Sequence, residues 1–228
     1  IIVFTKTNDT IEALTTFKEN IDKDTYLMSL QNGLGNLEKL SKFADRSKII
    51  YGTTMAPADL NGFREVSSFG SHLSQFKSGN SENNSFVKKI AEQFELSGLH
   101  SKVNMNVDNV IWDKVAFNTA MNTICALLEI TPKTIEESKN LKKFALNVAE
   151  ETCIIGKAFG IVISETNIAN NIKLSCREHG DHKPSMLQDV LLKKKTEIDS
   201  LNGEVVKIGS KLKISTPLNT SLYNLIKA

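Results

Sequence analysis

The hydrophobic pattern of the chain changes once, near Asn106, and this change limits the folds that the chain can adopt. Before Asn106, short apolar runs that suit buried strands alternate with segments of helical period. The expected strands are 1–6, 25–31, 48–55 and 99–105, and the expected helices are 9–20, the segment from the 32–35 turn to 43, and 81–96. Asn61-Gly62 lies between two further runs and predicts a β-hairpin. Alternation of this kind predicts a mostly parallel sheet covered by helices.

After Asn106 the pattern stays helical to the end of the chain. The expected helices are 107–130, 140–159, 164–178, 185–195, 197–212 and 219–227, separated by Pro132, Gly160, Pro184 and Pro217. The predicted fold class is therefore α/β followed by all-α, with one domain over residues 1–105 and a helical domain over residues 106–228.

Charge, apolar length and cysteine content exclude several classes of protein. The chain has 28 Lys and Arg against 26 Asp and Glu, and a net charge of +2 argues against a protein that binds a nucleic-acid backbone. Its longest apolar stretch, near Ile124–Leu128, is far shorter than a membrane span. The three cysteines are widely separated, which favours a reduced, cytoplasmic protein. His179 and His182 have no third ligand nearby, so no metal site is expected.

The segment Val107–Ile130 carries the most informative pattern. Lys114, Asn118 and Asn122 follow one another at i, i+4 and i+8 and share one helix face. Apolar residues occupy most of the remaining circumference, so we expect this helix to be buried on nearly all sides. An ammonium and two amides along one wall of a cleft would suit a polar ligand, and a desolvated lysine can donate a proton at neutral pH. Alternatively, Lys114 extends to water and the asparagines bond neighbouring backbone.

The turn Asn32-Gly33-Leu34-Gly35 follows an expected strand. Two glycines permit close approach of the backbone to a flat ligand, and free N–H groups at a helix start attract anions. The alternative is a tight strand-to-helix turn in which Asn32 is the N-cap.

Ser185 and the charged run after it also have structural interpretations. Ser185 with Gln188 three residues later fits a capping box, although a hydroxyl and free N–H groups at a helix start would also hold a substrate carboxylate. The run Lys193–Asp199 is typical of a solvated helix face.

Taken in order, these segments resemble the ketopantoate reductase (2-dehydropantoate 2-reductase) family. The matching strings are Gln31–Gly35, Ile111–Lys114 with Asn118 and Asn122, Ser185–Val190, Thr196–Asp199 with Leu201–Gly203, and Thr216-Pro217. Each string is modest alone, and their order and spacing over nearly the whole chain make the resemblance specific.

The resemblance implies an NADPH-dependent reduction of a 2-keto acid to a 2-hydroxy acid that feeds pantothenate and coenzyme A synthesis. It also implies a Rossmann-type nucleotide-binding domain followed by a helical substrate domain. Lys114 would be the general acid that protonates the ketone oxygen, and Glu197 would hydrogen-bond the substrate hydroxyl. The implied substrate-binding residues are Asn118, Asn122 and Ser185, and the implied cofactor-binding residues are Lys6, Asn32 and Gly33.

The chain departs from the family pattern in two places. Thr131-Pro132-Lys133 stands where the family usually has an Asn-Gly pair, which leaves the natural substrate open. The family begins with a strand, a GxGxxG turn and a helix that this sequence does not contain. We therefore expect roughly 65 to 80 residues to precede Ile1, and we expect the chain alone to bind NADPH weakly or not at all.

Two other functions fit the same residues. The first is a related 2-keto or β-hydroxy acid dehydrogenase with a different substrate, and the second is a non-catalytic binding or dimerisation fragment. For both enzyme functions, the ketopantoate reductase and the related dehydrogenase, the expected partner is a small-molecule 2-keto acid. Helical domains of this size often dimerise, so a homodimer is among the expected assemblies.

Overall fold

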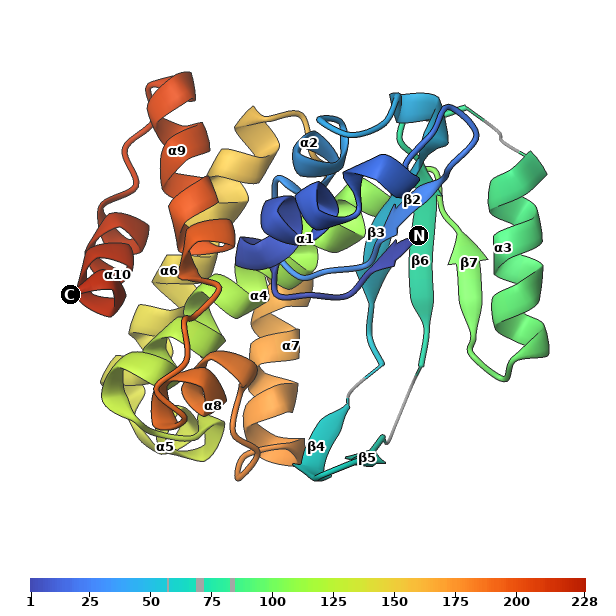
Figure 1. Cartoon of the computed structure of the whole chain (residues 1–228). Coiled ribbons are helices and arrows are strands. Elements are labelled where there is room, and N and C mark those ends of the chain that lie inside the picture. The colour runs from blue at the N-terminus through green and yellow to red at the C-terminus, as the bar shows by residue number, and fades with distance from the viewer. Residues whose placement is uncertain (57, 69–71, 83–84) are drawn as a thin grey trace. The chain divides into compact units, whose positions relative to one another are not determined.

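In a computed structural model, the chain forms two compact units, Ile1–Asp108 and Asn109–Ala228 (Figure 1). The structure describes residues 1–56, 58–68, 72–82 and 85–228, with the backbone but not the side chains of residues 59–61. The first unit combines a sheet with helices, and the second consists of helices and their connections. The predicted order, α/β followed by all-α, is confirmed.

The main sheet of the first unit has five strands in the order β1-β2-β3-β6-β7. They are β1 (Ile2–Val3), β2 (Leu27–Ser29), β3 (Ile49–Thr54), β6 (Ser74–Ser78) and β7 (Ser101–Val103). Only β3 and β6 pair antiparallel, and the other three pairings are parallel, as the sequence predicts.

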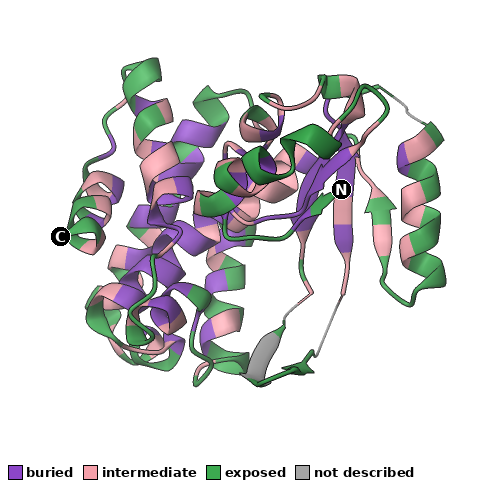
Figure 2. Ribbon diagram, in the orientation of Figure 1, coloured by how far each residue is buried: buried purple, intermediate pink, exposed green. Residues whose placement is uncertain are grey.

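The central strands β2 and β3 are buried on both faces because helices cover both sides of the sheet (Figure 2). Met28 and Ile50 pack in one cluster with Phe76 and with Val87 of α3 (Ser85–Leu96). Side chains alternate along a strand, so Leu27 and Ile49 point to the opposite face, toward α2 (Asn36–Leu40). Parallel sheets need this double cover.

The opening segments are shorter than predicted. The strand expected over 1–6 is limited to Ile2–Val3, and Ile2 is half exposed because β1 lies at an edge of the sheet. The helix expected over 9–20 ends at Thr16 as α1 (Thr10–Thr16), and a short 3₁₀ turn follows it. The Thr15 and Thr16 hydroxyls bond carbonyls four residues back, which weakens a helix end.

The predicted hairpin is present, but its turn differs. β4 (Asp59–Gly62) and β5 (Glu65–Ser67) pair antiparallel with a register shift between Leu60 and Gly62. Asn61-Gly62 therefore belongs to the strand, and Phe63 and Arg64 make the turn. Arg64 takes the left-handed conformation that the turn requires.

An ion pair between a buried lysine and a partly exposed aspartate ties the sheet to the first turn of α4 (Val107–Leu128) within the first unit. The Lys77 amine of β6 lies 2.6 Å from an Asp108 carboxylate oxygen and donates to the Met105 carbonyl at 3.1 Å. The Tyr51 hydroxyl of β3 donates to the same carboxylate at 2.8 Å. Burial and this bond raise the pKa of Tyr51. Lys77 is only 6% exposed, and the partners offset the large cost of burying its charge.

The second unit packs its helices around α4. The others are α5 (Pro132–Glu137), α6 (Lys139–Ala158), α7 (Glu165–Glu178), α8 (Ser185–Leu191), α9 (Asn202–Leu212) and α10 (Pro217–Lys227). Of the twelve residues of α4 from Val115 to Ala126, eleven are buried, as the apolar pattern predicts. Within the described residues, none of the helices has the length and apolar character that crossing a bilayer requires.

Two of the prolines that were predicted to separate helices instead begin one. Pro132 and Pro217 each occupy the first turn of a helix, α5 and α10, where the missing N–H costs nothing. The helix predicted over 197–212 begins only at Asn202, after a 3₁₀ turn over Ile198–Ser200.

Candidate functional site

Helix α4 presents the polar stripe that the sequence predicts. Asn118 and Asn122 are 6% and 8% exposed, and Lys114 is partly buried one turn before them. Their neighbours Val115 and Met121 are buried in the core of the helical unit. The three polar side chains therefore lie on a helix that is largely buried on its other sides.

Burial changes the chemistry of the Lys114 amine. It lowers the pKa of Lys114 from 10.5 to about 8, and the nearby Glu197 carboxylate opposes this by favouring the ammonium. At neutral pH the amine still carries its proton but releases it far more readily than an exposed lysine does. These are the properties of a general acid.

Glu197 comes from the segment between α8 and α9. The three lysines that precede it, Lys193–Lys195, are exposed, whereas Glu197 is 8% exposed. The Ser200 backbone N–H and hydroxyl both donate to the Glu197 carbonyl, at 3.1 and 3.0 Å. The prediction of a solvated face holds for the lysines and is wrong for Glu197, because the 3₁₀ turn folds its residues back onto the helical unit.

Ser185 is not the cap of a capping box. Pro184 holds the N-cap position of α8, so Ser185 is the first helical residue and makes no capping bond. Asn122 instead donates to the Ser185 hydroxyl at 3.3 Å. Gln188, the other half of the predicted box, donates to the Lys183 carbonyl at 2.9 Å.

The helical unit thus brings the predicted residues together in two pairs, Lys114 with Glu197 and Asn122 with Ser185. Asn118 lies between Lys114 and Asn122 along the helix. An ammonium, a carboxylate, two amides and a hydroxyl can bind a ligand that carries a carbonyl, a hydroxyl and a carboxylate.

The Asn32 turn of the first unit is held from several sides. Gly33 and Gly35 both have positive φ, at 84° and 82°, which the turn requires. The Thr7 hydroxyl donates to the Asn32 carbonyl at 2.9 Å, and the Asn36 amide donates to the same oxygen at 3.2 Å. Asn32 is not the N-cap, because α2 begins at Asn36 with Gly35 in the capping position.

Lys6 lies exposed in the segment that follows β1. Gln31 donates to the Thr5 carbonyl at 2.5 Å, and Lys39 donates to the Thr7 carbonyl at 2.9 Å, so both sides of Lys6 are anchored. Lys6 and Asn32 both follow the carboxyl ends of parallel strands, which is where α/β sheets bind ligands. The set fits a nucleotide cofactor: an exposed cation, a close-approach turn, and a buried Asn36 Oδ1 that accepts no hydrogen bond from the described residues.

Two further residues near the predicted sites, Gln31 and Asp113, were not predicted to have a role. Gln31 is buried and bonds Ser29, Thr10 and the Thr5 carbonyl, so it fixes the loop that carries Lys6. Asp113, next to Lys114, has a pKa raised by burial. A polar residue at the end of an apolar strand, and an acid on an apolar helix, were the available signals.

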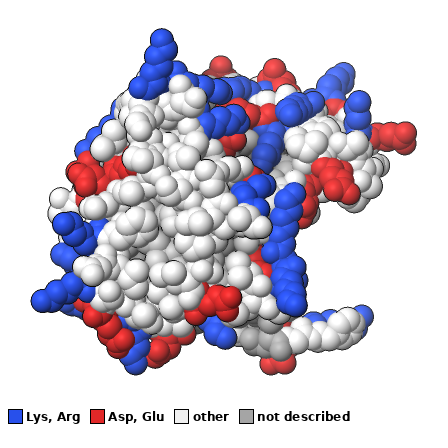
Figure 3. All heavy atoms as spheres, turned by 90° about the vertical axis from the view of Figure 1, so that its left-hand side faces the viewer, with Lys and Arg blue, Asp and Glu red and all other residues white. Residues whose placement is uncertain are grey.

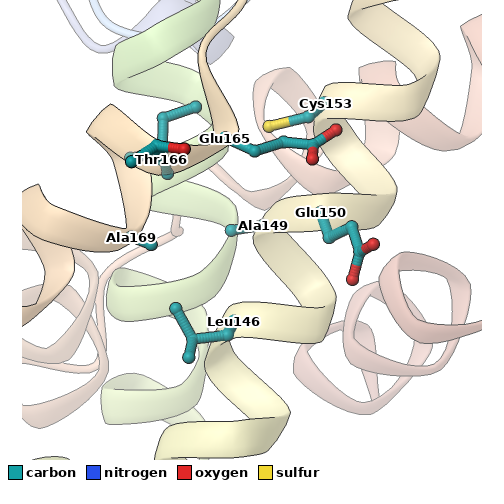
Figure 4. Close-up of a pocket in the computed structure, with 8 residues that line it drawn as sticks. Leu146, Ala149, Glu150, Cys153, Glu165, Thr166 and Ala169 are labelled. Atoms are coloured by element: carbon teal, nitrogen blue, oxygen red, sulfur yellow. The ribbon is translucent and has the colours of Figure 1, made fainter.

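A separate cavity of about 290 Å³ lies between α6 and α7 (Figure 4). Leu146, Ala149 and Cys153 line it with the carboxylates of Glu150 and Glu165. Burial raises the pKa of the Cys153 thiol to about 12, so it is not a nucleophile at neutral pH. None of the predicted site residues lines this cavity.

Two family models match the chain. The model described as ketopantoate reductase PanE/ApbA C terminal matches residues 106–228. The model described as ketopantoate reductase PanE/ApbA matches residues 1–83.

The chain is also similar to curated 2-dehydropantoate 2-reductases and to a solved dehydrogenase structure. The 2-dehydropantoate 2-reductase of Pyrococcus horikoshii is 33% identical over 228 residues, which is 100% of this chain and 74% of that protein. That of Lactococcus lactis is 29% identical over 230 residues, covering 99% of this chain and 73% of the relative. A solved ternary structure of D-mandelate dehydrogenase with NADH and anilino(oxo)acetate has a TM-score of 0.94 at 27% identity, covering 100% of this chain and 74% of that one.

Replacing Lys114 with Met should raise the free energy of unfolding near pH 7 by on the order of 2 kcal/mol, because the folded state no longer holds a desolvated ammonium. The pKa of Lys114 is 10.5 when unperturbed and about 8 when folded, so the penalty is complete below about pH 8 and disappears toward pH 10.5. Urea titrations near pH 7 and pH 10 measure the gain, which should shrink at the higher pH.

Lys143→Met is the matched control, because Lys143 is exposed on α6. It should change stability little at either pH. Equal effects of the two substitutions would contradict the assignment of a desolvated amine to Lys114.

Proposed function

The chain belongs to the ketopantoate reductase family of oxidoreductases, and on that premise we propose that it reduces 2-dehydropantoate to pantoate with NADPH in pantothenate and coenzyme A biosynthesis. The observation that carries the proposal is the partly buried Lys114, whose amine has a lowered pKa and interacts with the charge of Glu197, on a helix with two further amides. In this proposal residues 1–105 bind the cofactor and residues 106–228 bind the substrate.

Lys114 is the general acid in this reaction. The reduced nicotinamide, when bound, supplies the hydride that the carbonyl carbon accepts. The carbonyl π electrons move to the ketone oxygen, and the Lys114 ammonium gives that oxygen its proton. The lowered pKa of Lys114 reduces the barrier to this transfer, and its positive charge stabilises the developing alkoxide.

The other residues of the helical unit bind and orient the substrate. Glu197 accepts a hydrogen bond from the substrate hydroxyl and keeps Lys114 protonated through its charge. Asn118, Asn122 and Ser185 hold the polar ends of the substrate. The bond between Asn122 and Ser185 gives these two groups a fixed mutual orientation before a ligand arrives.

Lys6, Asn32 and Gly33 bind the cofactor. The exposed Lys6 amine provides a positive charge for a phosphate. Gly33 lets the backbone approach a flat ring, and Asn32 offers its side-chain amide at the same turn.

The protein is a cytoplasmic homodimer in this proposal, with a small 2-keto acid as its partner and no nucleic acid or membrane. The three cysteines Cys125, Cys153 and Cys176 are free and buried, which suits a reducing compartment. On the face shown in Figure 3, charges of both signs surround a broad uncharged area, with no large field of one sign. Leu212 and Leu225 are exposed on α9 and α10, and such apolar surface favours self-association.

A second candidate is the reduction of another 2-keto acid with NADH. The similarity to D-mandelate dehydrogenase, whose solved structure contains NADH, favours it. Thr131-Pro132-Lys133, where the family usually has an Asn-Gly pair, also leaves room for a different substrate.

A substrate panel separates the two candidates. We expect kcat/KM for ketopantoate with NADPH to exceed that for benzoylformate and for 2-ketobutyrate by at least about 100-fold, since hydrogen bonds to a substrate hydroxyl discriminate strongly against analogues that lack it. Each acid is tested on the full-length protein with NADPH and with NADH, by the loss of absorbance of the reduced nicotinamide. A preference for benzoylformate with NADH would replace the first candidate with the second.

Lys114→Ala should reduce kcat for ketopantoate by about 10²- to 10⁴-fold, the usual contribution of a general acid. Lys143→Ala, which removes an exposed lysine of α6, is the control and should leave kcat within about twofold. Full activity of Lys114→Ala would rule out the proposed mechanism.

A further inference from the structure

A second face of α4 carries polar residues that the proposed mechanism does not use. Thr119 and Thr123, one turn apart, are completely buried. At about 100° per residue, they lie on a different side of the helix from the stripe of Lys114, Asn118 and Asn122. Thr119 bonds Thr152 of α6 at 3.0 Å, and Thr123 donates to Asn202 of α9 at 2.7 Å.

Asn202 is the centre of this network. Its side chain is 0% exposed, and each polar atom of its amide is bonded. The Asn202 oxygen accepts from Thr123, and its nitrogen donates to the Thr119 carbonyl at 3.1 Å and to Asn219 of α10 at 3.0 Å. One amide group thus fixes the start of α9 against two successive turns of α4.

The segment from Glu197 to Asn202 is short and held at each step. The Glu197 carbonyl accepts both bonds from Ser200, and Ile198 and Leu201 are each 2% exposed. Asp199 accepts from the Tyr223 hydroxyl of α10 at 2.9 Å. A displacement of Asn202 along α4 would therefore also displace Glu197.

The network ends in a carboxylate that anchors α10. Glu151 of α6 accepts the backbone N–H groups of Leu218 and Asn219 at 3.0 and 2.8 Å, and the Asn219 side chain at 2.8 Å. Those N–H groups belong to the first turn of α10, where a negative charge is favourable. The partner of Asn202 is thus itself fixed.

We propose that Asn202 is a positioning residue, which holds the Glu197 segment in register with α4 and so sets the distance between the Glu197 carboxylate and the Lys114 amine. The proposal rests on the proposed role of Lys114 as general acid. Apolar side chains could pack α9 against α4 equally well, but their contacts do not select one register. Directional bonds to two successive turns do select one.

The test compares the pKa of Lys114 among variants, by NMR of protein labelled with ¹³C at the lysine ε-carbon. The Lys114 signal is assigned by its absence in Lys114→Arg. Burial and the charge of Glu197 are the two influences on this pKa, so Glu197→Gln should lower it and serves as the reference. Asn202→Leu should shift the pKa of Lys114 in the same direction, and it should add nothing in the Glu197→Gln background.

A matched pair of milder variants covers the case in which Asn202→Leu does not fold. Thr123→Val removes one bond to Asn202 and should lower the pKa of Lys114 by a smaller amount, whereas Thr123→Ser keeps the hydroxyl and should restore it. Ser221→Ala, at an exposed position of α10, should leave it unchanged. In turnover, Asn202→Leu should lose up to about 100-fold in kcat, as expected for a misplaced catalytic group.

The proposal is overturned if folded Asn202→Leu or Thr123→Val leaves the pKa of Lys114 at the wild-type value. It is also overturned if Asn202→Leu shifts this pKa equally with and without Glu197. The NMR measurement needs no substrate, so a protein that reduces a different acid would refute the proposed substrate without affecting this result.

Discussion

The helical unit depends on one physical constraint, which is that a charged amine is held on a helix that is otherwise packed in the core. Lys114 shares α4 with side chains that are almost completely buried, so its ammonium loses most of its water. A desolvated charge in this position costs stability, and an opposite charge reduces that cost. Glu197 supplies that opposite charge, and the two asparagines that follow Lys114 add polar groups along the same wall.

Hydrogen bonds of two buried asparagines supply a rigid frame in the same unit. Asn202 and Asn219 are fully buried, and their side chains bond one another and residues of α4 and α6. The two carboxylates have different roles. Glu151 accepts hydrogen bonds at the start of α10, and the charge of Glu197 favours the protonated form of the Lys114 amine. Burial lowers the pKa of Lys114, and the charge of Glu197 opposes that shift.

The sequence was sufficient to predict the fold class and the polar stripe of α4, because both depend on periodicity over many residues. It was insufficient where a single neighbour decides the outcome. Ser185 matched a capping box, but Pro184 takes the cap position and leaves Ser185 free to bond Asn122. Glu197 matched a solvated run, but a 3₁₀ turn buries it. Asn202, beside Gly203 in a matched string, gave no local signal of its contacts with α4, which lie about 80 residues away in sequence.

Lys114 acts as a general acid only if it loses its proton near pH 8. The pH dependence of kcat/KM for ketopantoate reduction tests this most directly, because it reports the ionisation of the free enzyme. We predict that kcat/KM is constant toward neutral pH and falls about tenfold per pH unit above about 8, as Lys114 loses the proton that the ketone oxygen needs. A value of kcat/KM that stays constant up to pH 10 would contradict the assignment of Lys114 as the general acid.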